Sequence, residues 1–316
     1  MEKIGKKNMK IKVIFPTKDK YIKKTRPAYY DWIFNGFKSL PGVNVIETDD
    51  MLKSSFNEPR QTITAIDIII DNIKIRVWYD WSDFQRFVYP EVIKENDLYY
   101  KVECSQGHLD RFNIQPAGHG VTEYHKYVNN LNRLRELKNK REYTCDVLGV
   151  FRATSPKPGL RSIRIDCAEI VQRMNINHYV KVQPCNFRPV PSQEHSIVKK
   201  YNYVEFLERT AKSKLNLLMP GMGELTWRVS ETFGMGACGI MPRITTILPG
   251  NPQNCWIEVK RDLSDLREKI EYYLSHDEER EQIAKNGLVY YEKHLTPTAQ
   301  AKNILQGAID VKRKIN

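Results

Sequence analysis

The amino-acid sequence predicts an α/β protein organised as two domains. Short runs rich in β-branched residues alternate with longer amphipathic segments along the chain, a pattern typical of open sheets covered by helices. A length of 316 residues suits two domains of ordinary size. The charged stretch 138–142 predicts a linker. We therefore expect one domain over residues 1–140 and a second over residues 143–296.

The composition is that of an ordinary globular protein, with 41% hydrophobic and 28% charged residues. No apolar run approaches the length of a membrane-spanning helix, and the first residues have too short an apolar core for a secretory signal. We therefore expect a cytoplasmic protein. None of the six cysteines forms a C-x-x-C pair, so they predict small core residues and neither a zinc cluster nor a redox motif.

The chain is basic, with 50 Lys and Arg against 38 Asp and Glu, a formal charge of +12. Such a balance favours a polyanionic neighbour: nucleic acid, an acidic membrane surface or phosphorylated ligands. The basic residues are spread along the whole chain, and no nucleic-acid-binding motif occurs. We therefore expect no specific nucleic-acid partner, while peripheral contact with the inner face of an anionic membrane stays a hypothesis.

The first 140 residues alternate between predicted strands and two predicted helices. The helices span residues 26–40, rich in aromatic side chains, and residues 121–140, rich in strong helix formers. The pair Asp71-Asn72 predicts a turn between two strands. The predicted strands span residues 10–15, 42–47, 63–70, 73–79, 97–102 and 112–115.

Polar loops follow three of these strands, over residues 80–83, 103–108 and 116–120. If the strands are parallel, the loops lie at one edge of the sheet, where α/β proteins bind ligands. Their carboxylates and imidazoles are candidate general bases, although capping and loop hydrogen bonds are the commoner roles of such residues. The candidates are Asp80, Asp83, His108 and His119.

Two of these candidates have a further feature. His119 lies between two glycines, which allow a ligand to approach the backbone. Asp80 and Asp83 could hold a divalent cation, but their spacing matches no known metal motif, so we predict no metal site.

The second half of the chain begins a new sheet at residues 145–151, with Arg152 at the carboxyl end of the strand. The predicted helix 160–174 carries Arg161 and Arg164 in its first turns, where cations oppose the helix dipole. An anion nearby would explain that placement, although surface arginines often tolerate it. A proline-rich loop is predicted over residues 184–193, further strands over 178–183 and 255–259, and further helices over 203–212, 263–274, 276–291 and 297–314.

Residues 215–241 predict the unit on which function depends. An apolar strand leads into a glycine loop, and Leu225, Val229 and Phe233 then follow at helical spacing. Gly234 and Gly236 end this helix before another buried strand. The loop and Arg152 thus end two strands of one sheet and would border one cleft.

This glycine loop suits a nucleotide diphosphate. Backbone amides of a glycine loop and a helix N-terminus attract phosphate. Arg228 can pair with a phosphate through its guanidinium fork, and Glu231 can accept hydrogen bonds from a ribose diol. The simpler alternative is a solvated Arg228–Glu231 ion pair, which stabilises a helix by a few tenths of a kcal/mol, on the order of 0.3.

Two segments resemble the GT-B glycosyltransferases, in particular the group 1-like sugar transferases of bacterial polysaccharide and spore-coat type. They read LNLLMPGMGELTWRVSETFGMGACGIM and SDLREKIEYYLSHDEEREQIAKNGLVYYEKHLTPTAQAKNIL. The resemblance covers about residues 143–309. It implies two Rossmann-like domains facing each other across a cleft, with the acceptor site in the first and the nucleotide-sugar site in the second. It also implies that the last helix, 297–316, packs back on the first domain.

The resemblance also implies roles for individual residues. Glu231 would bind the donor ribose, although its spacing to Gly234 is shorter than in the commonest form of the family's motif. Arg228 would hold the donor diphosphate, in the turn that begins the Thr226 helix, and Arg152 would support the phosphates. The family needs no obligatory metal and no cofactor. Side chains and amides facing the sugar or the pyrophosphate would come from Gly221, Met222, Gly223 and Glu224.

These observations favour a metal-independent glycosyltransferase that moves a sugar from a nucleotide-diphosphate donor to a hydroxyl of a glycan or a lipid-linked acceptor. If the enzyme inverts, Asp80 or His119 is the expected base; if it retains, none is needed. The alternatives are a non-catalytic basic protein that binds nucleic acid or an anionic glycan, and a nucleotide-sugar epimerase of the same two-domain shape.

Overall fold

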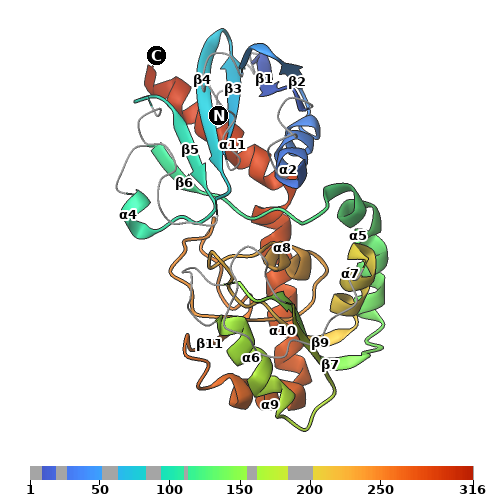
Figure 1. Ribbon diagram of the computed structural model, residues 1–316. Helices are drawn as coiled ribbons and strands as arrows, with labels where there is room; N and C mark the ends of the chain where they lie inside the picture. Colours follow the sequence, from blue (N-terminus) through green and yellow to red (C-terminus); the bar gives the residue numbers. More distant parts are fainter. Residues whose placement is uncertain are drawn as a thin grey trace, which may run out of the picture.

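The computed structural model describes residues 9–18, 27–51, 63–82, 94–109, 113–154, 162–183 and 202–315. Two β-sheets lie in opposite halves of the molecule, each with helices packed on it (Figure 1). The α/β class predicted from the sequence is confirmed, and most elements begin and end within a few residues of their predicted bounds. Asp83, Arg161 and the predicted loop 184–193 lie outside the described residues.

The first sheet has six strands in the order β2-β1-β3-β4-β5-β6. β1 runs parallel to β2, and β4, β5 and β6 are parallel to one another, but β3 is antiparallel to both of its neighbours. The strands are β1 (Ile11–Pro16), β2 (Val43–Thr48), β3 (Ile63–Ile70), β4 (Ile73–Asp80), β5 (Leu98–Lys101) and β6 (Asn113–Pro116).

The predicted turn at Asp71-Asn72 explains why this sheet is mixed, unlike an all-parallel Rossmann sheet. Both residues have positive φ angles, 49° and 75°, the conformation of a tight hairpin turn. A two-residue turn can join only antiparallel strands. Because β4, β5 and β6 remain parallel, the three polar loops that follow them lie at one edge of the sheet, as expected.

The second sheet is parallel throughout, with the order β11-β10-β9-β7-β8. After β7 the chain adds β8 on one side and then β9 on the other. The carboxyl ends of β7 and β9 therefore flank a topological switch point, where open α/β sheets bind their ligands. The strands are β7 (Cys145–Arg152), β8 (His178–Gln183), β9 (Ser213–Leu217), β10 (Gly239–Pro242) and β11 (Ile257–Val259).

Helices cover both sheets and join them. The largest apolar cluster is continuous across the two halves, because it joins Phe37 and Tyr127 to Val229, Phe233 and Tyr290. Most of the helices belong to the second half of the chain. The helices are α2 (Pro27–Lys38), α4 (Gln106–Leu109), α5 (Tyr124–Asn139), α6 (Ile163–Gln172), α7 (Tyr203–Ala211), α8 (Trp227–Gly234), α9 (Leu266–Ser275), α10 (Asp277–Tyr290), the π-helix η2 (Tyr291–Leu295) and α11 (Pro297–Ile315).

The last helix, α11, returns to the first sheet, behind whose strands it runs in Figure 1. It packs against α2, β3, β4 and β5 and buries Ala301, Ile304, Ala308 and Val311, which recur at helical spacing. Among the described helices, none is both long and apolar enough to cross a membrane.

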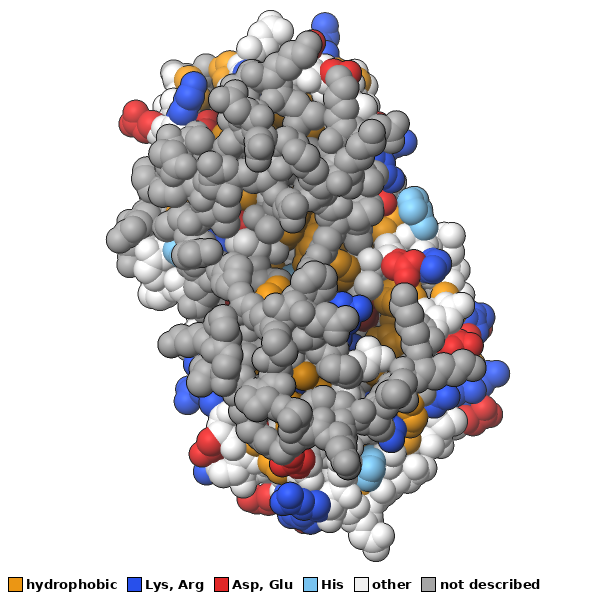
Figure 2. Space-filling view, in the orientation of Figure 1, with side chains coloured by type: hydrophobic (Ala, Val, Ile, Leu, Met, Phe, Trp, Pro, Cys, Tyr) orange, Lys and Arg blue, Asp and Glu red, His pale blue; other side chains and the backbone are white. Residues whose placement is uncertain are grey.

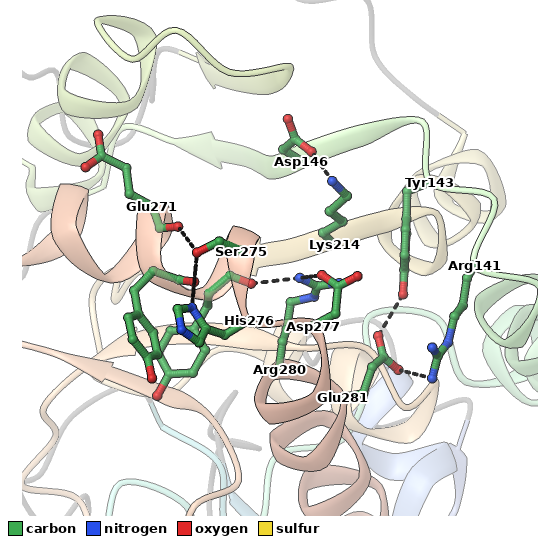
Figure 3. A network of polar contacts seen from close by, with 12 residues as sticks. Arg141, Tyr143, Asp146, Lys214, Glu271, Ser275, His276, Asp277, Arg280 and Glu281 are labelled. Carbon is green, nitrogen blue, oxygen red and sulfur yellow. Dashed lines mark hydrogen bonds and ion pairs between the residues drawn. The ribbon is translucent and has the colours of Figure 1, made fainter.

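The segment after α5 is tied to α10 by a polar network (Figure 3). Glu281 on α10 accepts hydrogen bonds from Tyr143 Oη and Lys138 Nζ, each at 2.7 Å, and Arg141 lies 3.8 Å from the same carboxylate. Lys138 is 4% exposed and Glu281 20%. The stretch predicted as a linker is thus held at a fixed position on the second half.

Candidate functional site

The glycine loop follows β9 at the switch point of the second sheet, and Arg164 of α6 spans the strand ends there. The Arg164 guanidinium donates to Met219 O (3.2 Å), to Arg152 O (3.1 Å) and to Thr154 Oγ1 (2.8 Å). These acceptors within the protein account for the position of Arg164 in α6 without the anion that the sequence suggested. The side chain of Arg152 is exposed at the end of β7.

Gly221 is a position where the chain approaches this guanidinium closely. A Cβ added at Gly221 would lie 2.7 Å from Arg164 Nη2 and 2.9 Å from Thr154 Oγ1. Glycine is therefore the residue that fits without displacing a neighbour. Met222 and Gly223 follow in the loop, and both are partly exposed.

Thr226 precedes the first turn of α8. Its backbone is extended, with φ −135° and ψ 157°, as at other helix starts. Its hydroxyl Oγ1 is buried and has no hydrogen-bond partner within the part of the chain that the structure describes. A buried hydroxyl without a partner is costly, and this one lies at the start of α8.

Arg228 lies in the first turn of α8 and is half-buried. Its guanidinium packs over the rings of Phe206 and Phe151, at 4.6 Å and 5.8 Å from the ring centroids. Burial lowers the pKa of Arg228, while the charge of Glu231 opposes that shift. A cation at a helix N-terminus is disfavoured by the helix dipole, and a bound anion would reverse that cost.

Glu231 is 2% exposed and faces the first half of the molecule. Its Oε1 accepts hydrogen bonds from Tyr203 Oη (2.6 Å) and from the backbone amide of Thr122 (2.9 Å). Among the described residues, Oε2 accepts no hydrogen bond. The structure therefore places Glu231 at the junction of the two halves, with Arg228 about one turn earlier on the same helix.

Glu224 is oriented differently from the expectation that it faces the sugar. Its carboxylate accepts hydrogen bonds from the backbone amides of Thr245 (2.6 Å) and Thr246 (2.7 Å) and forms an ion pair with Arg261. Glu224 therefore fastens the glycine loop to the segment after β10.

Asp80, one of the two expected bases, is fully buried at the end of β4. Its Oδ2 accepts hydrogen bonds from Tyr99 Oη (2.6 Å) and Lys101 Nζ (3.0 Å), and Oδ1 accepts one from the Ser82 amide (2.8 Å). Both oxygens are thus engaged, an arrangement that suits a structural ion pair and not a base that meets a substrate. His108 has a local role, because its Nδ1 accepts from the Ser105 amide at 3.0 Å.

His119, the other expected base, lies against α8. Its carbonyl accepts a hydrogen bond from Ser230 Oγ of α8 at 2.5 Å, and its Nδ1 lies 3.2 Å from Tyr29 Oη. The ring of Tyr29 stacks on Trp81, with centroids 4.9 Å apart, and meets the edge of Trp227 at 4.8 Å. Of the two candidates, only His119 therefore contacts the helix that carries Arg228 and Glu231.

Sequence reasoning missed two residues of this site, Tyr203 and Glu103. Tyr203 begins α7 and donates to Glu231, but a tyrosine at the start of a short helix gives no signal of such a contact. Glu103 lies in one of the three polar loops and is fully buried. It contacts the glycine loop at Leu225.

Among the described residues coloured in Figure 2, Lys and Arg lie interspersed with Asp and Glu. Over the described ranges, no three His, Cys, Asp or Glu side chains gather as a metal site would require.

Comparison with known proteins identifies the family. The family model described as glycosyl transferase-like matches residues 130–306, more than half of the chain. A solved glycosyltransferase from Rickettsia africae ESF-5 is similar over 71% of this chain, with 12% sequence identity and a TM-score of 0.45. This chain covers 65% of the length of that one. The search of curated proteins gave no match.

The second sheet is parallel and has a switch point followed by a glycine loop, the architecture of an α/β protein in which ligands bind at the carboxyl ends of the strands. The chain belongs to the glycosyl transferase-like family. The resemblance predicted from residues 143–309 is thereby confirmed at the level of the family.

Proposed function

We propose that the protein transfers a sugar from a nucleoside-diphosphate donor to a hydroxyl of a glycan or a lipid-linked acceptor. The observation that carries this proposal is the position of Arg228 and Glu231 on α8, beside the switch point of a parallel sheet. Family membership supports the reaction class. The half-buried cation and the buried carboxylate support a ligand that has both a diphosphate and a diol.

The donor diphosphate lies at the start of α8 in this proposal. The first backbone amides of the helix point toward the ligand, Thr226 Oγ1 offers a hydroxyl donor, and Arg228 supplies charge. Arg152 adds a second cation from the end of β7. Negative charge develops on the diphosphate as the sugar departs, and preorganised cations and amides stabilise it there. No metal is needed for that role.

The donor ribose lies at Glu231 in this proposal. Tyr203 and Thr122 fix the orientation of Oε1, so Oε2 is held in one position to accept hydrogen bonds from the diol. Charge-assisted hydrogen bonds of this kind are about twice as strong as neutral ones. Met222 and Gly223 border the sugar, whereas Glu224 acts by holding the loop.

The acceptor enters from the first half of the molecule. For an inverting transfer we propose His119 as the base, because it contacts α8 and lies between glycines, while both oxygens of Asp80 are engaged. A retaining transfer would proceed without this base. The pH profile of His119→Gln against that of the wild type distinguishes the two routes, since an imidazole base titrates near neutral pH.

The proposal is tested by calorimetry with ADP, CDP, GDP, TDP and UDP. Arg228→Ala and Glu231→Gln are expected to weaken the tightest of these complexes at least about tenfold, the equivalent of roughly 1.4 kcal/mol. Gln retains an oxygen for Tyr203 and Thr122, so that variant removes mainly the charge. Arg267→Ala, at an exposed position of α9, is the matched control and should bind as the wild type does. Unchanged affinity in both site variants would contradict the proposal.

The reaction itself is tested with sugar nucleotides and glycan acceptors. Transfer requires release of the free nucleoside diphosphate that increases with acceptor concentration, and removal of divalent cations should leave the rate unchanged. Conversion of the donor into an epimer without release would point to an epimerase. Tight oligonucleotide binding that falls steeply with salt would point to a nucleic-acid binder.

We also propose a peripheral membrane contact for a lipid-linked acceptor. The last turn of α11 carries the exposed Arg313 and Lys314, and the adjacent Ile315 is 46% exposed. Lys312 beside them pairs with Asp71 at 2.6 Å. Basic side chains near an anionic surface each contribute about 1 kcal/mol. Flotation with vesicles containing phosphatidylglycerol is expected to recover the wild type at low salt. Charge reversal at Arg313 and Lys314 should reduce recovery, and equal recovery would contradict the contact.

A further inference from the structure

Glu103 is a buried carboxylate at the end of the first sheet that accepts hydrogen bonds from two residues of the second half of the chain. It follows β5 by two residues and is 0% exposed. Its Oε1 accepts a hydrogen bond from the backbone amide of Leu225 at 2.8 Å. Its Oε2 accepts one from Thr246 Oγ1, also at 2.8 Å. A carboxylate is buried in this way only where donors compensate the loss of water.

The first partner, Leu225, is the last residue of the glycine loop before Thr226 and the start of α8. Its amide orientation fixes where the helix begins. Arg228 lies two residues after Thr226, and Glu231 follows Arg228 by less than one helical turn. A shift of the backbone at Leu225 therefore moves both of the donor-binding side chains together.

The second partner, Thr246, belongs to the segment that Glu224 also holds. Glu224 accepts a hydrogen bond from the Thr246 amide at 2.7 Å, while Glu103 accepts one from the Thr246 hydroxyl. The neighbouring Ile247 amide donates to Cys104 O at 2.7 Å. Two carboxylates, one from each half of the molecule, thus converge on one threonine and fasten the glycine loop between them.

The first half also fixes α8 further along its length. The Thr122 amide donates to Glu231 at 2.9 Å, and Ser230 Oγ donates to His119 O at 2.5 Å. The start and the middle of α8 are therefore both positioned by residues of the first half. The second sheet alone does not determine the geometry of the donor site.

We propose that Glu103 is a positioning residue for donor binding. It acts through the Leu225 amide and Thr246, aligns the glycine loop and the start of α8 with the cleft, and does not itself contact the donor. This inference rests on the proposed function, because it assumes that α8 and its loop bind the donor.

The test compares Glu103→Ala, Glu103→Gln and Thr246→Val by calorimetry, with whichever of ADP, CDP, GDP, TDP and UDP binds the wild type most tightly. Glu103→Ala should weaken binding about tenfold or more. Glu103→Gln should stay within about twofold, because its amide can accept from Leu225 and donate to Thr246. Thr246→Val removes one of the two contacts and should have an intermediate effect of about threefold.

Asp97→Ala is the matched control for the loss of a buried carboxylate. Asp97 is 8% exposed immediately before β5 and accepts hydrogen bonds from Trp78 Nε1 (2.8 Å) and from the Lys94 amide (3.1 Å), away from the glycine loop. It should lower the melting temperature and leave nucleotide affinity unchanged. Equal affinity losses in Asp97→Ala and Glu103→Ala would overturn the inference, as would failure of Gln to restore binding. If Glu103→Ala does not fold, Thr246→Val and Glu103→Gln decide the question.

Amide hydrogen exchange separates this inference from the proposed function. Faster exchange over residues 221–226 in Glu103→Ala or Thr246→Val, but not in Asp97→Ala, supports positioning whether or not a nucleotide binds. Unchanged exchange in that segment overturns the positioning role. If the wild type binds none of the five nucleotides but exchange is altered in the variants as expected, the proposed function is wrong and the role of Glu103 in shaping the loop still holds.

Discussion

Glu281 shows how one carboxylate holds the connection between the two halves. Burial opposes its ionisation, but hydrogen bonds from Lys138 and Tyr143 outweigh that effect and lower its pKa below the usual 4.5. A carboxyl group with a lowered pKa stabilises the folded state above the pKa of the unfolded chain. That stability is lost as the pH falls below 4.5 and through the lower pKa of the folded state.

Glu281→Gln is therefore expected to reduce the free energy of unfolding at pH 7 by about 1–3 kcal/mol, because the buried Lys138 loses its charged partner. The deficit should shrink as the pH falls below 4.5, where the wild type loses the same contribution. Urea unfolding at a series of pH values measures this difference in the free energy of unfolding between the variant and the wild type. Gln282→Ala, next to it on α10, is the control. A deficit that is constant down to low pH would contradict the account.

Local pattern singled out Arg228 and Glu231 but not the residues that position them. Both were predicted as donor-binding residues from one glycine loop and one amphipathic helix, and that role stays a prediction; the structure places Glu231 at the junction of the two halves. The partners of Glu103 lie 122 and 143 residues away in the sequence, so a polar residue in a loop gave no sign of its role. Glu224 was expected to face the sugar or the pyrophosphate. Its carboxylate instead accepts hydrogen bonds from the amides of Thr245 and Thr246, 21 and 22 positions further along the chain.

At the scale of elements, α2 and α11 cross at a glycine. A Cβ at Gly36 would lie 2.2 Å from the backbone oxygen of Pro297 and 3.2 Å from Ala301 Cβ. The first atom belongs to the backbone and cannot rotate away. The two helices can therefore approach this closely only because position 36 has no side chain.

Gly36→Ala is expected to destabilise the protein by about 1–3 kcal/mol, since overpacking must push α11 away from α2. Gly107→Ala is the matched control, because a Cβ at Gly107 meets no atom within 4 Å. Both variants gain the same helix propensity, so the difference between their melting temperatures isolates the crossing. Equal melting temperatures would show that α11 shifts without cost.

The ends of elements were predicted correctly where residues such as glycine terminate a helix locally. The predicted end of α8 at Gly234 and Gly236 is confirmed, and Gly236 has a φ of 70° that favours glycine. Strand order was not predicted in the first sheet. The insertion of antiparallel β3 between β1 and β4 depends on packing between distant segments, which hydrophobic periodicity does not report.

At the scale of the whole molecule, the last helix links the end of the chain to the first sheet. Tyr79 Oη donates to Gln300 Oε1 at 2.7 Å, and Tyr100 Oη donates to Asn303 O at 3.1 Å. Ile304 is 1% exposed between these contacts. The stability of the first sheet therefore depends on residues that lie more than 200 positions away.

Ile304→Ala is expected to lower stability by about 2–5 kcal/mol through loss of buried surface and the cavity left behind. Amide exchange should rise more in β3 and β4 than in β7 and β9, because regions open separately according to their local stability. Val289→Ala, at a side chain that is 55% exposed, is the control. An equal rise across both sheets would show that the two halves open as one unit.

The π-helix between α10 and α11 determines which side of α11 faces the first sheet. Its wider turn closes with the Thr296 amide bonded to Tyr291 O at 3.0 Å, and Pro297 then begins α11. Each residue of an α-helix advances the side chains by about 100°. Loss of one residue from this turn would thus rotate the apolar stripe of α11 by more than a quarter of a revolution, and would put Lys302 and Lys312 where Ala301 and Val311 are buried.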